Sequence, residues 1–360
     1  MTAASTRRLQ ITLVVPELVW PEPDDRETLA ELALPGLATL LARSRLQRRP
    51  QQSLEATVCA ACGLGDDTAY AACRVHGEEH GPAAGSAVWL CADPIHLRLH
   101  QERLILADAA TLDIAASEAR AIVDALDRHF ADAGRFHLAS SDRWYLELAA
   151  GREPGHFDVL PLSAVAGRSV SRQLPETAEA RWLRRLLNEA QMVLHQHPVN
   201  QRRDEADRAT INSLWLWGAG RLPAAGDVPF TDVWSDLPLA RGCGRVAGSR
   251  IRERPAAGAA ALLAQAARGG QHLVVLDGLQ PCVQYEDGAA YRAALLEFEG
   301  SWFAPLRQAL ASGRVRRLCL QAPTAYGLLS WSSDTRAQWK LWQRPPTLQA
   351  IARDLAATAA

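Results

Sequence analysis

The sequence predicts an α/β protein: a doubly wound core that carries an inserted α+β domain. Two apolar runs, Gln10 to Pro16 and His272 to Asp277, have the length and composition of strands buried on both faces. Strand and helix patterns alternate around each run. Between them, residues 87–148 show several short strand patterns around a single helix. Alternating strand and helix patterns are typical of an α/β core, whereas several strands grouped around one helix are typical of an α+β domain. We therefore expect the middle of the chain to be an inserted domain.

The outer parts supply the other elements of the predicted core. Thr28 to Leu46 has the spacing of a helix that is interrupted at Pro35-Gly36. Ala257 to Arg268 and Ala289 to Ala311 are further amphipathic helix patterns, and Val315 to Leu320 is a further strand. Asp277 follows a predicted central strand, at the edge where open α/β sheets place their sites.

The inserted part contains four predicted strands and one well-marked helix. Ser117 is expected to cap the helix and Gly134 to end it. Asp93 and His96 follow the first strand, where a polar pair could serve a ligand; a turn that starts at Asp93-Pro94 is the alternative. The predicted strands are Val88 to Cys91, Leu104 to Ala107, Phe136 to Ser140 and Trp144 to Leu148.

Length and charge exclude several classes of protein. A chain of 360 residues is long enough for two domains. The formal net charge is −1, so no global basic field is present to hold nucleic acid. No apolar run approaches the roughly 20 residues of a membrane span. We therefore expect a cytoplasmic protein with neither a nucleic-acid nor a membrane partner.

The seven cysteines are scattered and odd in number, which argues against a disulfide framework. Cys59 and Cys62, with Cys73 and His76, have a spacing that could suit zinc. Both stretches also have the pattern of short alanine-rich helices. A cysteine in such a helix is most simply a small apolar residue, and this is the interpretation we favour.

A candidate anion site lies in the stretch from His195 to Pro223. A helix pattern, Glu176 to His195, ends in a basic turn, and the strand pattern Ile211 to Trp217 follows. A glycine-rich loop comes next. Glycines after a strand let backbone N–H groups approach an anion, and arginines offer a planar fork to phosphate or carboxylate. The alternative is a buried sheet edge with a tight turn and solvated arginines.

Several motifs in the middle of the chain occur in the same order in a known family. These are Ala92 to Leu97 (ADPIHL), the helix Ser117 to Phe130, Arg143-Trp144-Tyr145, His197 to Arg203 (HPVNQRR) and Asn212 to Pro223 (NSLWLWGAGRLP). Together they resemble the inserted substrate domain and the strand after it in archaeal-type cofactor-independent phosphoglycerate mutases. They resemble more closely the bacterial RpfE-type regulatory proteins. The similarity covers about Val88 to Pro223.

This resemblance implies a shortened alkaline-phosphatase-like core, residues 1–86 and 205–360, with a substrate-type insertion at 87–204. In the mutases the chemistry needs two divalent metals, such as manganese, and a Ser or Thr nucleophile. Here the first strand continues to Glu17, no histidine follows Asp277, and the late strand leads into Leu320 to Pro323 without an Asp-His pair. We therefore predict no catalytic residues and no cofactor, with Asp277 and Glu17 as weak metal candidates.

The sequence thus predicts a small-anion-binding regulatory protein that has lost its metal and nucleophile site. The ligand is expected to be a phosphate ester or a carboxylate. The predicted binding residues are Asn200, Arg202, Arg203, Asn212, Gly218, Gly220, Arg221, His197, Asp93 and His96.

Two alternatives stay open. The first is an active metal-dependent phosphoglycerate mutase, an isomerase, or a phosphatase. The second is a protein-interaction module, because the segment Leu328 to Trp342 carries Trp331, Trp339 and Trp342, a composition found at interface hot spots. These tryptophans could instead cover the core as an ordinary C-terminal arm.

Overall fold

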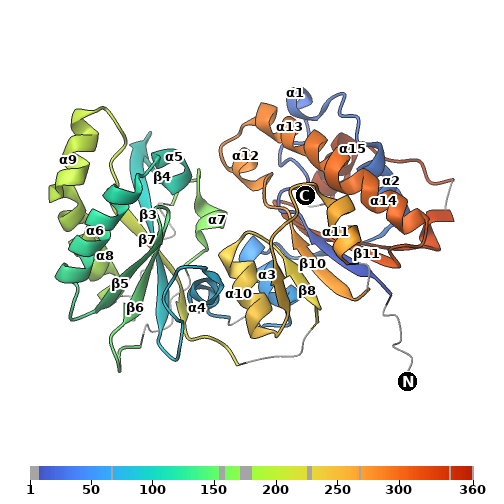
Figure 1. Ribbon diagram of the computed structural model, residues 1–360. Helices are drawn as coiled ribbons and strands as arrows, with labels where there is room; N and C mark the ends of the chain where they lie inside the picture. The colour runs from blue at the N-terminus through green and yellow to red at the C-terminus, as the bar shows by residue number, and fades with distance from the viewer. Residues whose placement is uncertain are drawn as a thin grey trace, which may run out of the picture. The chain divides into compact units, whose positions relative to one another are not determined.

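The computed structural model describes residues 8–65, 68–153, 159–170, 181–224, 229–266, 269–339 and 342–358. The chain forms two compact units (Figure 1). Met1–Gly63 and Gly226–Ala360 make the first unit, and Leu64–Ala225 makes the second. The start of the helix predicted from Glu176 lies outside the described residues.

The first unit is built on a mixed seven-stranded sheet. Its order is β2-β12-β11-β1-β10-β8-β9, and the five strands from β11 to β9 run parallel. The two strands predicted to be buried on both faces are confirmed as the central neighbours β1 and β10. The strands are β1 (Gln10–Val14), β2 (Arg45–Arg49), β8 (Asp232–Trp234), β9 (Arg250–Arg252), β10 (Gln271–Val275), β11 (Arg317–Thr324) and β12 (Gly327–Asp334).

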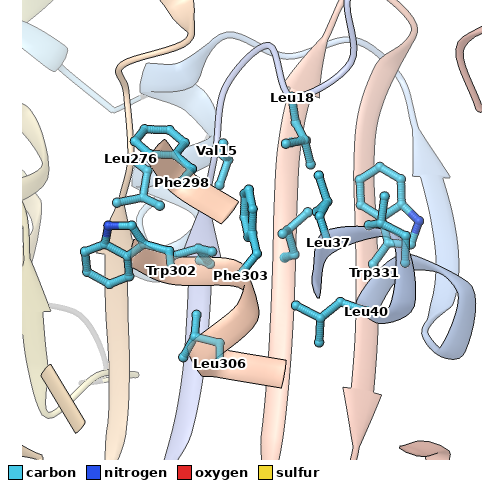
Figure 2. Packing of buried hydrophobic residues seen from close by; sticks show 14 of the residues in the cluster. Val15, Leu18, Leu37, Leu40, Leu276, Phe298, Trp302, Phe303, Leu306 and Trp331 are labelled. Carbon is cyan, nitrogen blue, oxygen red and sulfur yellow. The ribbon is translucent and has the colours of Figure 1, made fainter. Parts of the chain in front are cut away.

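Helices cover both faces of this sheet. On one face the core combines strand residues with Phe298, Trp302 and Phe303, as Figure 2 shows. On the other, α10 packs so closely on β8 that a Cβ on Gly244 would lie 2.9 Å from Val233 Cγ2. The helices are α1 (Arg26–Leu29), α2 (Pro35–Arg43), α3 (Leu54–Ala61), α10 (Pro238–Val246), α11 (Ala259–Gln265), α12 (Gln280–Gln284), α13 (Gly288–Phe298), a π-helical turn (Glu299–Phe303), α14 (Ala304–Ala311), a 3₁₀ turn (Ala337–Trp339) and α15 (Leu348–Ala357).

The predicted interruption at Pro35-Gly36 is the start of α2. The buried Glu299 carboxylate accepts hydrogen bonds from Gly36 N (2.6 Å) and Leu37 N (3.0 Å), and so caps this helix with a negative charge. Gly36 lacks a Cβ where one would lie 2.6 Å from Glu299 Oε1. The predicted end of the helix at Leu46 is wrong. The chain leaves α2 after Arg43 because Arg45–Arg49 pairs with β12, a tertiary contact that no local pattern reveals.

The second unit is an antiparallel sheet with helices. β3 pairs with β4, β6 and β7, and β6 pairs with β5. All four predicted strands and the predicted helix are confirmed, although β3 runs on to His100. The elements are α4 (Tyr70–Gly77), β3 (Trp89–His100), β4 (Arg103–Asp108), α5 (Ala109–Leu112), α6 (Ala116–His129), β5 (Gly134–Ser140), β6 (Arg143–Leu148), α7 (Leu162–Val165), α8 (Arg181–Gln196), α9 (Pro198–Glu205) and β7 (Ser213–Gly220).

The bounds of the second unit differ from the expected insertion at 87–204. It begins earlier because α4 packs on its sheet, and a Cβ on Gly218 of β7 would lie 2.9 Å from Tyr70 Cβ. It ends later because β7 pairs with β3 along its length, which ties residues beyond 204 to this sheet. Among the described residues, no helix combines the length and the apolar character that a membrane span needs.

Candidate functional site

The basic turn between α8 and α9 is organised by His197. His197 is the N-cap residue of α9, and its Nδ1 accepts a hydrogen bond from Val199 N at 3.2 Å. Pro198 occupies the first helical position, where the missing N–H costs nothing. The turn predicted from the sequence is therefore a helix start, and the basic residues that follow belong to α9.

Two of the predicted ligands in this turn are buried and bonded to protein. Asn200 donates from Nδ2 to the carbonyls of Leu194 (2.8 Å) and Ile211 (2.7 Å), and its Oδ1 accepts from Ile211 N. It ties the end of α8 to the chain that enters β7. A side chain with all of these bonds made within the protein is best explained as a structural clamp.

Arg203 is bonded in the same way. Its guanidinium donates to the Ala209 carbonyl from Nε, to Glu118 Oε2 from Nη1 at 2.7 Å, and to the Leu112 carbonyl from Nη2. The side chain is only 1% exposed. Arg203 thus fixes α9 against the start of α6, and each of its three nitrogens already has a protein acceptor.

Arg202, the next residue along α9, has the opposite environment. It is exposed, as is Arg128 near the end of α6, and neither guanidinium has a hydrogen-bond partner among the described residues. Burial lowers the pKa of His197, a hydrogen bond with the Ala121 backbone opposes this, and the positive charges of Arg202 and Arg128 lower the pKa further. We call Arg128, His197 and Arg202 the basic patch.

Asn212 and His96 join β7 to β3. Asn212 accepts from Leu97 N at 2.7 Å and donates to the Leu97 carbonyl at 2.9 Å, as a paired backbone would. His96 Nδ1 lies 2.8 Å from the Thr210 carbonyl. Both side chains therefore hold β3 and the chain that enters β7 together by hydrogen bonds.

Asp93 is completely buried inside β3, so the prediction that it sits at a strand end is wrong. Its carboxylate receives Arg74 Nη1 at 2.7 Å, Arg74 Nη2 at 2.6 Å and Trp217 Nε1 at 2.8 Å. Burial alone lowers the pKa of Arg74, but the attraction of Asp93 outweighs it, and the pKa lies well above its ordinary value. The Arg74 guanidinium also lies over the rings of Tyr145 and Trp217.

The predicted glycine-rich loop lies at the other end of β7. Gly218 (φ +68°) and Gly220 (φ +144°) let β7 approach the start of α4, since a Cβ on Gly220 would lie 2.7 Å from Ala69 Cβ. Arg221 donates to the Ser86 carbonyl and pairs with Glu153. Gly218 and Gly220 are the last part of β7 itself, and the five strand residues Ser213 to Trp217, about 17 Å at the usual rise, lie between Gly218 and the end of β7 nearer the basic turn. The two loops therefore do not form the single site that the sequence suggested.

The carboxyl edge of the large sheet carries the two weak metal candidates. Glu17 follows β1 and Asp277 follows β10, as predicted. Burial raises the pKa of Asp277, and the nearby Arg254 partly offsets this. Arg254 itself donates from Nε to Asp236 at 3.0 Å, so a paired guanidinium lies near this edge. Within the described residues, no three His, Cys, Asp or Glu side chains cluster as metal ligands.

The four residues of the zinc alternative belong to different units. Cys59 and Cys62 are in the first unit, whereas Cys73 and His76 are in the second. Cys59 Sγ lies 3.5 Å from Cys243 Sγ, between α3 and α10. Cys59, Cys62 and Cys73 are buried, as expected for small apolar residues.

Comparison with known proteins concerns mainly the second unit. Residues 95–200 match the family model of the 2,3-bisphosphoglycerate-independent phosphoglycerate mutases. The second unit is phosphoglycerate-mutase-like. A relative from Methanosarcina mazei with this name is 28% identical over 145 residues, which are 39% of this chain and 36% of the relative. Phosphoglycerate mutase 2 of Methanothermobacter thermautotrophicus is 31% identical over 179 residues, 46% of this chain and 43% of that protein.

The match spans less than half the length of these two curated relatives. A solved structure, the PH0037 protein from Pyrococcus horikoshii, aligns with 98% of this chain and 96% of its own. The TM-score is 0.57 at 14% identity, so this likeness concerns the fold alone. The mixed α/β architecture thus extends beyond the part with detectable sequence similarity.

Sequence reasoning missed Arg128 and Arg74. Arg128 lies on the predicted helix, but 69 positions before His197, and nothing local links it to the basic turn. Arg74 lies in a stretch whose alanines and cysteine predict only a helix. A buried arginine needs a carboxylate, so Asp93 among apolar neighbours was the one signal that could have suggested a basic partner nearby.

His197 makes the stability of the protein depend on pH. Its folded-state pKa lies below 6.5, so the neutral ring is favoured in the folded protein. The stability that the neutral ring contributes is present above pH 6.5 and is lost as the pH falls through the folded pKa. We expect His197→Asn, which keeps an N-cap acceptor, to lose less stability than the wild type between pH 7.5 and pH 5. Urea midpoints at both pH values test this, and equal losses would contradict it.

Proposed function

We propose that this chain is a phosphoglycerate-mutase-like regulatory protein, of the RpfE type, that binds a small phosphate ester or carboxylate. The observation that carries the proposal is the basic patch. Arg128 and Arg202 lie exposed on α6 and α9, and their charges lower the pKa of His197. Because both positive charges act at the His197 ring, an anion bound beside this ring is attracted by both.

The chemistry of the basic patch suits a small anion. Each guanidinium offers a planar set of donors that matches phosphate or carboxylate oxygens. The scaffold is firm, because Arg203 and Asn200 fix α9 from its buried side. Arg202 is therefore presented from a helix whose buried side is held in place, so little order of the backbone has to be gained on binding.

The first unit favours binding over turnover. Metal-assisted phosphoryl transfer depends on divalent cations held at the reacting group. At the carboxyl edge of this sheet Asp236 is already paired with Arg254, close to Asp277. A fixed guanidinium disfavours further cations there. At the end of β11 the chain turns into the hairpin with β12, and the Thr324 hydroxyl there donates to the Gly327 carbonyl, a bond within the protein.

Thermal unfolding with 3-phosphoglycerate tests the proposal. At a free ligand concentration about five times Kd, we expect the melting temperature to rise by about 1–2 °C. Arg202→Ala and Arg128→Ala should each abolish the rise, because each removes one donor fork. Arg185→Ala is the matched control, since Arg185 is an exposed arginine on α8 that pairs only with Glu189 among the described residues.

Two results would end this proposal. One is the absence of any shift with 3-phosphoglycerate, inorganic phosphate or simple carboxylates. The other is a shift that persists in both patch variants, since the anion would then bind elsewhere.

The second candidate is an active metal-dependent mutase, an isomerase. It is favoured by the family match of residues 95–200 and by Glu17 and Asp277 at the ends of neighbouring strands. A coupled assay of 3-phosphoglycerate conversion to 2-phosphoglycerate with added manganese separates the two. Turnover that a chelator abolishes establishes this candidate and refutes the regulatory proposal.

A further inference from the structure

Two tryptophans of the first unit are almost fully exposed. Trp339 is 79% and Trp342 is 77% exposed, whereas Trp331 in β12 is buried. Of the three tryptophans in the C-terminal stretch, one therefore belongs to the core and two do not. Large aromatic side chains left in water at neighbouring positions are typical of binding surfaces.

The same unit contains an apolar pocket. Its volume is about 360 Å³, and α2 forms one wall while the start of α15 and the two prolines before it form the other. The lining is almost entirely aliphatic: it includes Leu34, Leu37, Leu41, Pro345, Pro346 and Leu348. A pocket of this size and lining accepts an apolar side chain of leucine to tryptophan size.

The chain places the two tryptophans near the pocket. Trp342 precedes the lining residue Pro345 by three positions, which limits their separation to about 11 Å. Arg43, at the end of α2, donates to the Gln338 carbonyl at 2.8 Å, next to Trp339. We call the pocket with Trp339 and Trp342 the tryptophan surface.

The segments around this surface carry a net positive charge. Residues 31–49 contain four arginines and one acidic residue, and residues 334–354 contain three arginines, one lysine and two acidic residues. Arg353 is paired with Asp24, but the two segments are still more basic than the chain as a whole, whose net charge is −1. Arg45, Arg49, Arg336 and Arg344 are exposed.

We propose that the tryptophan surface binds an acidic segment of a partner protein. One apolar side chain of that segment fills the pocket, others pack on Trp339 and Trp342, and its carboxylates face the surrounding arginines. Charge complementarity selects this occupant, because a second copy of the same basic surface would be repelled. Single-stranded nucleic acid could stack on the tryptophans, but it carries nothing to fill an aliphatic pocket.

Fluorescence anisotropy with a labelled 18-residue peptide tests the proposal on the full chain. The peptide consists of glutamates with leucine and phenylalanine anchors at helical spacing, and its comparison peptide has alanine at every anchor. We expect only the anchored peptide to bind. Trp342→Ala and Ala38→Trp, which fills the pocket, should each raise Kd by about tenfold or more. Leu296→Ala, at an exposed leucine on α13, is the matched control and should bind as the wild type does.

Several outcomes would overturn this inference. These are equal binding of both peptides, no binding of either peptide, unchanged affinity in both surface variants, and tighter binding of a 20-residue oligothymidylate than of the anchored peptide. Melting temperatures of the variants confirm that each is folded. Because the surface lies in the first unit, the result is independent of the basic patch.

Discussion

Replacing Asp93 with alanine is expected to destabilise the protein by about 3–5 kcal/mol, the cost of leaving a buried charge without its partner. The Arg74 guanidinium would lose both of its hydrogen bonds to the carboxylate, and Trp217 would lose the acceptor of its Nε1–H. Water cannot replace the carboxylate, because Asp93 is completely buried and Arg74 is 8% exposed. The loss should appear as a lower urea midpoint with an unchanged slope.

A double variant distinguishes the cost of an unpaired buried charge from the cost of changing these two positions. Arg74→Met with Asp93→Leu removes both charges and keeps apolar volume, so we expect it to recover most of the lost stability. If Asp93→Ala cost less than about 1 kcal/mol, Arg74 would not depend on this carboxylate, and the description of the pair as a buried anchor would fail.

Arg203→Ala is expected to cost about 3 kcal/mol, whereas Arg202→Ala should leave the free energy of unfolding near the wild-type value. Arg203 is 1% exposed, and its loss leaves the carbonyls of Leu112 and Ala209 and the Glu118 carboxylate with fewer donors. Arg202 is exposed and has no such contacts within the described part of the chain. Two adjacent arginines of one helix should therefore give opposite results.

Anion binding completes this comparison. Arg202→Ala should lose the thermal shift with 3-phosphoglycerate while remaining as stable as the wild type. Arg203→Lys, which keeps the charge but not the fork, should lose stability and retain some shift. Equal stability of the Arg202 and Arg203 alanine variants would show that the assigned roles are wrong.

The parts of the fold that follow from local pattern were predictable. The apolar runs at β1 and β10 identified the central strands, and the spacing along residues 117–130 identified α6. β2 was not predictable, because the segment Arg45–Arg49 is exposed and arginine-rich and becomes a strand only by pairing with β12. β8 and β9 are three residues each, too short to leave a periodic signal.

The candidate site was also predictable only where it depends on local pattern. Sequence identified the basic turn, but it could not show that Arg203 points inward to Glu118 while Arg202 faces solvent. It also could not bring Arg128 to this turn, since α6 and α9 meet only in the folded protein. Asp93 was expected to serve a ligand, but its partner Arg74 is provided by a helix outside the recognised motifs.

The most direct test is a ³¹P NMR spectrum of 3-phosphoglycerate incubated with the protein and magnesium, because one spectrum reports both binding and turnover. We predict that the 3-phosphoglycerate resonance broadens or shifts with the wild type and not with Arg202→Ala, and that no 2-phosphoglycerate resonance grows in. A growing 2-phosphoglycerate resonance, or an unperturbed spectrum at every protein concentration, would contradict the proposed function.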